Sequence, residues 1–201
     1  FQAPPVNSLG FALRDGLVSA LERASADAAV DGVVLIGSNG TFSAGADIRE
    51  FGGTAVRQRP TLWTLNSLLD SMPKPVVAAI EGVALGGGLE LAMSCHQRVA
   101  LSSAKIGLPE VNLGLIPGAG GTVRLPRLID PIEAARLAVT GKPIGAEEAT
   151  QLGLFDSIAE GDLLDAAIAL AQDAANKPLP AALLTRQAPD VERSTWDDAI
   201  A

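Results

Sequence analysis

Apolar residues follow a helical period at the start of the chain. Over residues 9–25 leucines recur at every fourth position with charged side chains between them, which predicts an amphipathic helix. Buried strands are predicted by three short apolar runs, at residues 32–36, 76–80 and 97–101. Further helices are expected near residues 47–51, 62–69 and 88–94.

Glycine and proline divide the rest of the chain. Residues 37–47 read GSNGTFSAGAD, a glycine-rich loop, and residues 52–60 lack an apolar period, which predicts a mobile surface loop. A glycine-interrupted turn and a helix are expected within residues 113–129. Three short helices follow, separated by Pro143, Gly153 and Pro178. Because strands alternate with helices, the expected fold class is α/β with largely parallel pairing.

Length and composition are those of one globular domain. The 201 residues are 48% hydrophobic and 19% charged, enough to close one sizeable core. The net charge of −8, without a cluster of lysine and arginine, argues against nucleic acid as a partner. The single cysteine, Cys95, cannot form an internal disulfide, and no Cys/His pattern indicates a metal site. No apolar run reaches the roughly 18–20 residues of a membrane span, and no targeting signal is recognised.

Two of the predicted strands run into loops of small residues. The strand at 32–36 leads to SAGAD at residues 43–47, and the strand at 76–80 leads to ALGGGLE at residues 84–90. Ligands bind beyond the carboxyl ends of strands in open α/β sheets, so both loops are expected to direct backbone N–H groups into one crevice. Such donors can hold a developing oxyanion. The alternative is that both loops are merely tight turns.

Two carboxylates stand in apolar surroundings. Glu90 lies in the first turn of its predicted helix within LELAM, and Glu110 lies between leucine and valine in GLPEVNLG. A pair of partly buried carboxylates can act as a general base and a general acid on one substrate. The alternative for Glu90 is a helix-capping role on a solvated face. Asp47 and Glu50 belong to a charged DIRE run and are expected at the surface.

Several other catalytic motifs are missing or unsupported. The GAGGTV sequence at residues 118–123 ends in valine where a dinucleotide-binding fingerprint needs glycine. No phosphate-binding P-loop sequence and no GxSxG nucleophile elbow is present. His96, the only histidine, is not favoured as a catalytic group, and Cys95 is expected to be a small core residue.

Three sequence blocks carry a family resemblance: FSAGADIREF, KPVVAAIEGVALGGGLELAMSC and IGLPEVNLGLIPGAGGTVRLPRLI. They resemble the signature blocks of the crotonase, or enoyl-CoA hydratase/isomerase, superfamily, and the match runs over about residues 5–176. With HQRVA after SC, the chain is most similar to the N-terminal hydratase/isomerase part of multifunctional fatty-acid β-oxidation enzymes. The resemblance implies a crotonase-like ββα spiral core with C-terminal helices. Residues 1–201 are expected to be a single domain trimmed at both ends, with a core at 1–176 and the start of a helical tail at 177–201.

The same resemblance implies roles for individual residues. The thioester carbonyl oxygen of an acyl-CoA is expected between the backbone N–H groups of Ala46 and Gly87. Glu90 and Glu110 match the two family glutamates: both hold the attacking water, Glu90 acts chiefly as its base, and Glu110 delivers a proton to the α-carbon. The implied substrate-binding residues are Ser43, Ala44, Asp47, Ile48, Arg49 and Gly86 for the CoA portion and the thioester, and Leu115, Ile116 and Pro117 for the acyl tail.

The expected activity is therefore that of an enoyl-CoA hydratase, a lyase that adds water syn across the 2-enoyl double bond of an acyl-CoA. Two alternatives remain: a 3-enoyl-CoA to 2-enoyl-CoA isomerase, and a noncatalytic acyl-CoA binding subunit. No metal or separate cofactor is expected, because CoA enters as part of the substrate. The expected partners are a homo-oligomer or a downstream hydroxyacyl-CoA dehydrogenase domain. The expected compartment is the cytoplasm, or the peroxisome or mitochondrion in a eukaryote.

Overall fold

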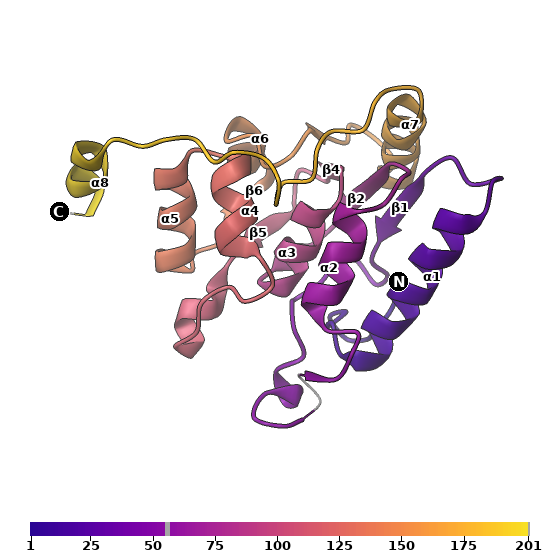
Figure 1. Cartoon of the computed structure of the whole chain (residues 1–201), viewed down its shortest axis with the longest axis horizontal. Coiled ribbons are helices and arrows are strands. Elements are labelled where there is room, and N and C mark those ends of the chain that lie inside the picture. Colours follow the sequence, from indigo (N-terminus) through magenta and orange to yellow (C-terminus); the bar gives the residue numbers. More distant parts are fainter. Residues whose placement is uncertain (55–56, 201) are drawn as a thin grey trace.

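The computed structural model describes residues 1–54 and 57–200. In this part of the chain, parallel pairing joins one sheet in the order β1-β2-β4-β7 (Figure 1). Its strands are β1 (Val33–Ile36), β2 (Val76–Ile80), β4 (Gln97–Ala100) and β7 (Ser157–Ile158). A second sheet has the order β3-β5-β6, and its strands are β3 (Val83–Leu85), β5 (Lys105–Gly107) and β6 (Ile144–Gly145). In this sheet β5 pairs with β3 in parallel and with β6 antiparallel.

Helices surround both sheets. The α-helices are α1 (Phe11–Ala26), α2 (Leu62–Asp70), α3 (Gly87–Ser94), α4 (Gly121–Leu128), α5 (Pro131–Thr140), α6 (Ala146–Gln151), α7 (Leu163–Ala175) and α8 (Arg193–Ile200). The 3₁₀ helices η1 (Ile48–Glu50) and η3 (Pro109–Leu113) lie in the loops after β1 and β5. The predicted α/β class with largely parallel pairing is thus confirmed.

Strand β2 occupies the centre of the larger sheet, and all five of its residues are buried. Val76, Ala78 and Ile80 belong to the main core, whereas Val77 and Ala79 pack in a second cluster with the apolar face of α7. Helices or core residues therefore cover both faces of this strand. This explains why the strand is a continuous apolar run in the sequence, since both faces of a parallel sheet are usually buried.

The smaller sheet and β7 are not predicted by the sequence pattern. Strands β3 and β5 have three residues each, and β6 and β7 have two, which is too short for a period-2 pattern. The short helices after α4 do end before Pro143, Gly153 and Pro178, as expected. Of the loop predicted at residues 52–60, positions 55 and 56 lie outside the described residues.

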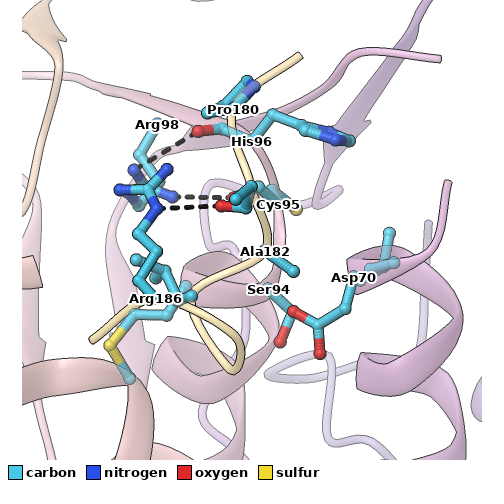
Figure 2. A pocket seen from close by; sticks show the side chains of 12 residues that line it. Asp70, Ser94, Cys95, His96, Arg98, Pro180, Ala182 and Arg186 are labelled. Atoms are coloured by element: carbon cyan, nitrogen blue, oxygen red, sulfur yellow. Dashed lines mark hydrogen bonds between the residues drawn. The ribbon is translucent and has the colours of Figure 1, made fainter. Parts of the chain in front are cut away.

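The segment after α7 crosses the molecule before α8 (Figure 1). Figure 2 shows part of it, with Pro180, Ala182 and Arg186 against a small hollow of about 20 Å³ that includes Cys95 and His96. There the Nδ1 of His96 accepts a hydrogen bond from the Val76 N–H at 3.0 Å. Burial raises the pKa of the Cys95 thiol to about 12. The hydrogen bond gives the His96 ring a structural role. Cys95 stays protonated, and a protonated thiol is a poor nucleophile.

Candidate active site

The three consecutive glycines lie where β3 meets α3. At each of them a neighbouring atom lies close to the position that a Cβ would take. Gly86 has φ of 51°, and a Cβ there would approach the Glu110 carboxylate to 3.0 Å. A Cβ on Gly87 would lie 2.6 Å from the Leu62 side chain, and one on Gly88 would lie 2.5 Å from the Ser43 carbonyl oxygen. The first position needs a conformation that other residues rarely adopt, and the other two leave no room for a side chain.

The SAGAD loop runs alongside β3. Ser43 donates its N–H to the Val83 carbonyl at 2.9 Å and accepts from the Leu85 N–H at 3.0 Å, as one more rung beside the strand. The chain then turns at Gly45, which has φ of 103°. Glycine is needed there because a Cβ would lie 2.7 Å from the Leu85 carbonyl oxygen. These bonds fix the loop that carries Ala46 against the start of α3.

The backbone amides of Ala46 and Gly87 face one space. The Cβ position of Gly87 is only 3.2 Å from the Ala46 nitrogen. Within residues 1–54 and 57–200, neither N–H donates a hydrogen bond to another protein atom. Two unpaired backbone donors this close together form an arrangement that can stabilise a negatively charged oxygen.

A cavity of about 310 Å³ opens at these amides. Its lining includes Ala46 and Gly87, both glutamates, and the loop residues Leu115 and Ile116. Leu115 and Ile116 are large apolar residues, yet they are 44% and 79% exposed. The cavity therefore combines backbone donors, two carboxylates and an apolar wall, a composition that fits a small-molecule site.

Glu90 is held at the base of the cavity by the first turn of α3 and is 2% exposed. Its Oε1 accepts two hydrogen bonds at 2.8 Å, from the N–H groups of Ala119 and Gly121. Burial raises the pKa of the Glu90 carboxyl, while these two amides and the charge of Arg124 act in the opposite direction. Both bonds go to one oxygen, which leaves Oε2 for a ligand.

Glu110 projects from η3, which begins at Pro109 after β5. Its Oε2 is buried without a hydrogen-bond partner among the described residues. Burial, with a smaller contribution from the charge of Glu90, raises the pKa of the Glu110 carboxyl to about 7. The two carboxyl groups thus differ: Glu90 is tied to backbone donors, whereas Glu110 has an unpaired oxygen and takes up a proton near neutral pH.

The raised pKa of Glu110 gives a prediction for stability. The folded protein binds this proton more tightly than the unfolded chain, so the associated stability is present below about pH 4.5 and is lost as the pH rises through about 7. Glu110→Gln cannot ionise. We expect the Tm of Glu110→Gln minus that of the wild type to increase by about 2–4 °C from pH 4.5 to pH 8. The expected increase is kept small because the carboxyl is partly exposed to solvent. A Tm difference that does not change with pH in thermal unfolding would contradict this.

The other residues suggested for substrate binding are not all at the cavity. Ser43 is fully buried, and its hydroxyl donates to the Asn7 carbonyl at 2.7 Å and accepts from the Gly45 N–H at 3.1 Å. Pro117 is buried outside the lining. Ala44, the residue after Ser43, is exposed, and its N–H donates to the Val6 carbonyl at 3.0 Å. The structure therefore gives Ser43 the role of shaping the loop.

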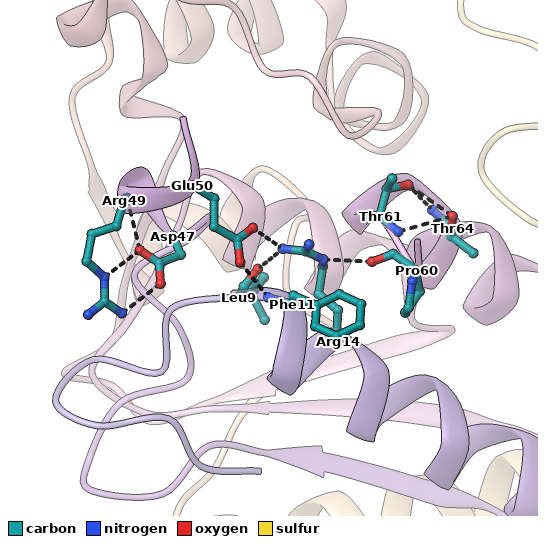
Figure 3. A network of polar contacts seen from close by, with 9 residues as sticks. All are labelled: Leu9, Phe11, Arg14, Asp47, Arg49, Glu50, Pro60, Thr61 and Thr64. Atoms are coloured by element: carbon teal, nitrogen blue, oxygen red, sulfur yellow. Dashed lines mark hydrogen bonds and ion pairs between the residues drawn. The ribbon is translucent and has the colours of Figure 1, made fainter. Parts of the chain in front are cut away.

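Residues 47–50 continue the same loop as η1 (Figure 3). Asp47 caps this helix and binds the guanidinium of Arg49 at 2.7 and 2.9 Å, and the Arg49 side chain is 81% exposed. Ile48 is also exposed, at 64%. Arg49 and Ile48 thus present a cation and an apolar group to solvent, and they follow Ala46, a lining residue of the cavity, by three and two residues.

The expectation that Asp47 and Glu50 are surface residues was wrong. Their side chains are 12% and 15% exposed. Glu50 binds Arg14 of α1 at 2.8 Å and accepts from the Phe11 N–H at 2.6 Å, while Arg14 also donates to the Pro60 carbonyl at 2.8 Å (Figure 3). Arg14 therefore ties both ends of the 51–59 segment to α1, 36 residues or more away in sequence.

The cavity also has three large lining residues that the sequence does not single out: Phe51, Leu62 and Trp63. Phe51 follows η1, and the other two begin α2. All three fall in helices that the sequence predicts, at residues 47–51 and 62–69, and no local motif distinguishes them as lining residues. The exposure of Trp63 at 46% is the feature that separates it from a core residue.

The described residues contain no group of three or more histidine, cysteine, aspartate or glutamate side chains placed to hold a metal ion. Across those same residues, no helix has the length and apolar character needed to cross a membrane.

Comparison with known proteins finds relatives of this chain in sequence and in fold. Residues 1–192 match the sequence profile described as enoyl-CoA hydratase/isomerase. A probable enoyl-CoA hydratase of Bacillus subtilis (strain 168) is 44% identical over 181 residues, which cover 87% of this chain and 70% of that protein. The crystal structure of an enoyl-CoA hydratase from Bacillus anthracis superposes with a TM-score of 0.79 at 39% identity, covering 86% of this chain and 69% of that one.

A longer relative is also similar. The peroxisomal bifunctional enzyme of Danio rerio is 49% identical over 176 residues, which cover 88% of this chain. The matched part is 24% of that protein, so the chain spans about a quarter of its length.

Proposed function

The chain belongs to the enoyl-CoA hydratase/isomerase family, and from this premise we propose that it is an enoyl-CoA hydratase of fatty-acid β-oxidation. The reaction is the syn addition of water to the double bond of a 2-enoyl-CoA. One observation carries the proposal: two unpaired backbone amides and two unlike carboxyl groups line the same cavity. That set matches a reaction which places negative charge on a thioester oxygen while one proton leaves water and another reaches carbon.

The amides of Ala46 and Gly87 would bind the thioester carbonyl oxygen. As the water oxygen bonds to C3, the electron pair of the double bond moves toward the thioester carbonyl oxygen. That carbonyl oxygen therefore gains enolate character. The N–H donors are fixed by the turns at Gly45 and Gly86 and carry no net charge, so they need little reorganisation as the negative charge develops.

The two glutamates would divide the proton transfers. Glu90, with Oε1 held by two amides, takes a proton from water at Oε2 as the C3–O bond forms. Glu110, protonated up to about pH 7, gives its proton to C2. A proton then passes from Glu90 back to Glu110, directly or through solvent, before the next turnover. Because the carboxyls interact, the pH profile reports the pair and not either residue alone.

Substrate binding is proposed on chemical grounds. Arg49 is the exposed cation beside the Ala46 loop and would pair with a CoA phosphate, with Ala44, Asp47 and Ile48 along the same stretch. The exposed Leu115 and Ile116, at the cavity wall, would cover the acyl tail. Pro117 and Gly86 shape this wall and the thioester turn.

The test is the loss of absorbance at the enoyl-thioester band when the purified protein is mixed with crotonyl-CoA. We expect a rapid loss that requires both carboxyls, so the controls are Glu90→Gln and Glu110→Gln made separately, and each should lose nearly all of the wild-type rate. Absence of turnover in a folded wild-type protein that still binds the acyl-CoA would favour a noncatalytic binding subunit.

The second candidate is the isomerisation of a 3-enoyl-CoA to a 2-enoyl-CoA. It is favoured by the unpaired Oε2 of Glu110 and its pKa of about 7, since one such carboxyl can remove and return a proton on the same substrate. Supplying a 3-enoyl-CoA separates the two candidates: formation of the 2-enoyl product without 3-hydroxyacyl-CoA would identify an isomerase.

The larger context is also a proposal. We propose that residues 1–201 act as a single crotonase-like domain, either in a homo-oligomer or followed by a hydroxyacyl-CoA dehydrogenase domain, since one relative is named a bifunctional enzyme. No separate cofactor is needed for the hydration, because CoA arrives with the substrate. The peroxisome is the proposed compartment for a eukaryotic source, from the name of the Danio rerio relative, and the cytoplasm for a bacterial one.

A further inference from the structure

We propose that Arg124, paired with Asp70, is a positioning residue for Glu90, acting through the turn at residues 119–121. This inference rests on the proposed function insofar as it concerns turnover. Its structural content, that one buried guanidinium holds the turn that holds the Glu90 carboxylate, stands on contacts independent of the substrate.

Arg124 lies on α4 and is fully buried, the largest such side chain among the described residues. Its Nη1 donates to the Ala119 carbonyl at 3.0 Å, and its Nη2 forms an ion pair with Asp70 at the end of α2. The Trp63 ring lies 5.8 Å from the guanidinium carbon. A buried cation with a carboxylate, a carbonyl and an aromatic ring as partners is fixed in one orientation.

Both backbone polar groups of Ala119, its N–H and its carbonyl, form hydrogen bonds. Its carbonyl accepts from Arg124 and also from the Nδ2 of Asn66, at 3.1 Å, while its N–H donates to Glu90 Oε1 at 2.8 Å. Gly120 has φ of 104°, and a Cβ there would fall 1.9 Å from the Arg124 guanidinium. The turn is therefore shaped around the arginine, and its two N–H groups meet on one carboxylate oxygen.

This geometry determines which oxygen of Glu90 reacts. If the 119–121 turn rotates, the amides of Ala119 and Gly121 no longer converge on Oε1. The carboxylate is then free to turn, and Oε2 is no longer held in the position from which it would accept a proton from water. A misplacement of a base by a fraction of an ångström changes the reaction step more than it changes substrate binding. The loss of Arg124 is thus expected in kcat more than in KM.

The charges around Glu90 add a second readout. Arg124 on α4 lowers the pKa of Glu90, Asp70 on α2 offsets part of that positive charge, and Glu110 on η3 interacts with the same carboxyl. Of the strands near α3, β3 holds no titratable residue, and Arg98 on β4 pairs with Asp156 and bonds carbonyls at the far end of α3.

Two substitutions should therefore move the pH profile in opposite directions. Arg124→Met removes the cation, which raises the pKa of Glu90 and thereby shifts the acidic limb that the carboxyl pair gives to kcat/KM to higher pH. Asp70→Asn leaves the cation without its counter-charge and shifts that limb to lower pH. We expect Arg124→Met to lower kcat about 30-fold with KM within about threefold, and Arg124→Lys to recover part of the loss through its retained charge.

The matched control is Arg136→Met on α5, whose guanidinium pairs with Glu133 and Glu148 at the surface. It removes the same group away from the cavity and should leave kcat and the pH profile unchanged. The proposal is overturned if folded Arg124→Met keeps the wild-type kcat, or if the Arg124→Met and Asp70→Asn profiles shift in the same direction.

A measurement without turnover separates this inference from the proposed function. The amide resonance of Gly121 in ¹⁵N-labelled protein reports the ionisation of Glu90, to which that N–H is bonded. Its titration midpoint should rise in Arg124→Met and fall in Asp70→Asn, even if crotonyl-CoA is not hydrated. Unchanged midpoints in both folded variants would overturn the positioning role, whatever reaction the wild type catalyses.

Discussion

Glu110→Gln is expected to lower kcat for hydration by about 10³-fold while KM for the acyl-CoA changes less than about threefold. The amide is nearly the same size as the carboxyl and fits the space behind Gly86, but it has no proton of suitable acidity for C2. About 10³-fold corresponds to about 4 kcal/mol of barrier, within the range for one general acid. The contrast between kcat and KM is the signature, because the residue would act on the reaction step and not on CoA binding.

Steady-state kinetics with crotonyl-CoA at pH 6 and pH 8 would check this. The matched control is Glu160→Gln, an exposed carboxyl before α7, which should behave as the wild type. A Glu110→Gln variant that keeps a tenth or more of the wild-type kcat would remove Glu110 from the mechanism. The same variant is the one expected to gain stability at alkaline pH, so low activity with a higher Tm also excludes misfolding as the cause.

Gly87→Ala is expected to lower kcat/KM by about 10³-fold, the second largest effect. The added methyl would lie 3.2 Å from the Ala46 nitrogen, in the space where both amides would meet the thioester oxygen. Loss of a single oxyanion donor costs about 10²–10³-fold in kcat, and this methyl obstructs both donors. It would also press on Leu62 at 2.6 Å, so the N-terminus of α2 must shift to admit it.

The control for this change is Gly16→Ala in α1. No atom lies within 4 Å of the Cβ position there, so the same methyl should leave the activity unchanged and slightly raise stability through helix propensity. Kinetics and thermal unfolding of both variants would be compared. If Gly87→Ala hydrates crotonyl-CoA within tenfold of the wild type, the thioester oxygen does not sit between these two amides.

Periodicity and composition were sufficient for the larger elements. Residues 76–80 form a strand as predicted, and the helix expected at 9–25 occupies Phe11–Ala26. These elements could be predicted because their burial follows from side chains near each other in sequence. Strands β3 and β5 could not, because three-residue segments become strands only by pairing with each other and with the Ser43 rung.

The charged network was predicted least well. Glu50 appeared exposed within DIRE, yet it is covered because Arg14 on another element reaches it. Arg124 carried no signal at all in GGTVRLPR, although it is fully buried and holds the Ala119 carbonyl. Whether a charged residue is buried depends on a counter-charge and carbonyls contributed by distant segments, which no local pattern contains.

The longer strands and helices, the two glycine loops and two carboxylates in apolar surroundings could be predicted from the sequence, because each is a property of a few neighbouring residues. That Glu90 and Glu110 share a cavity with the amides of Ala46 and Gly87 follows from the packing of separate elements. The same packing brings amides 29 and 31 residues away to Glu90. Such contacts arise when separate elements pack, and the packing sets both the distances and the desolvation that make the two carboxyl groups unlike.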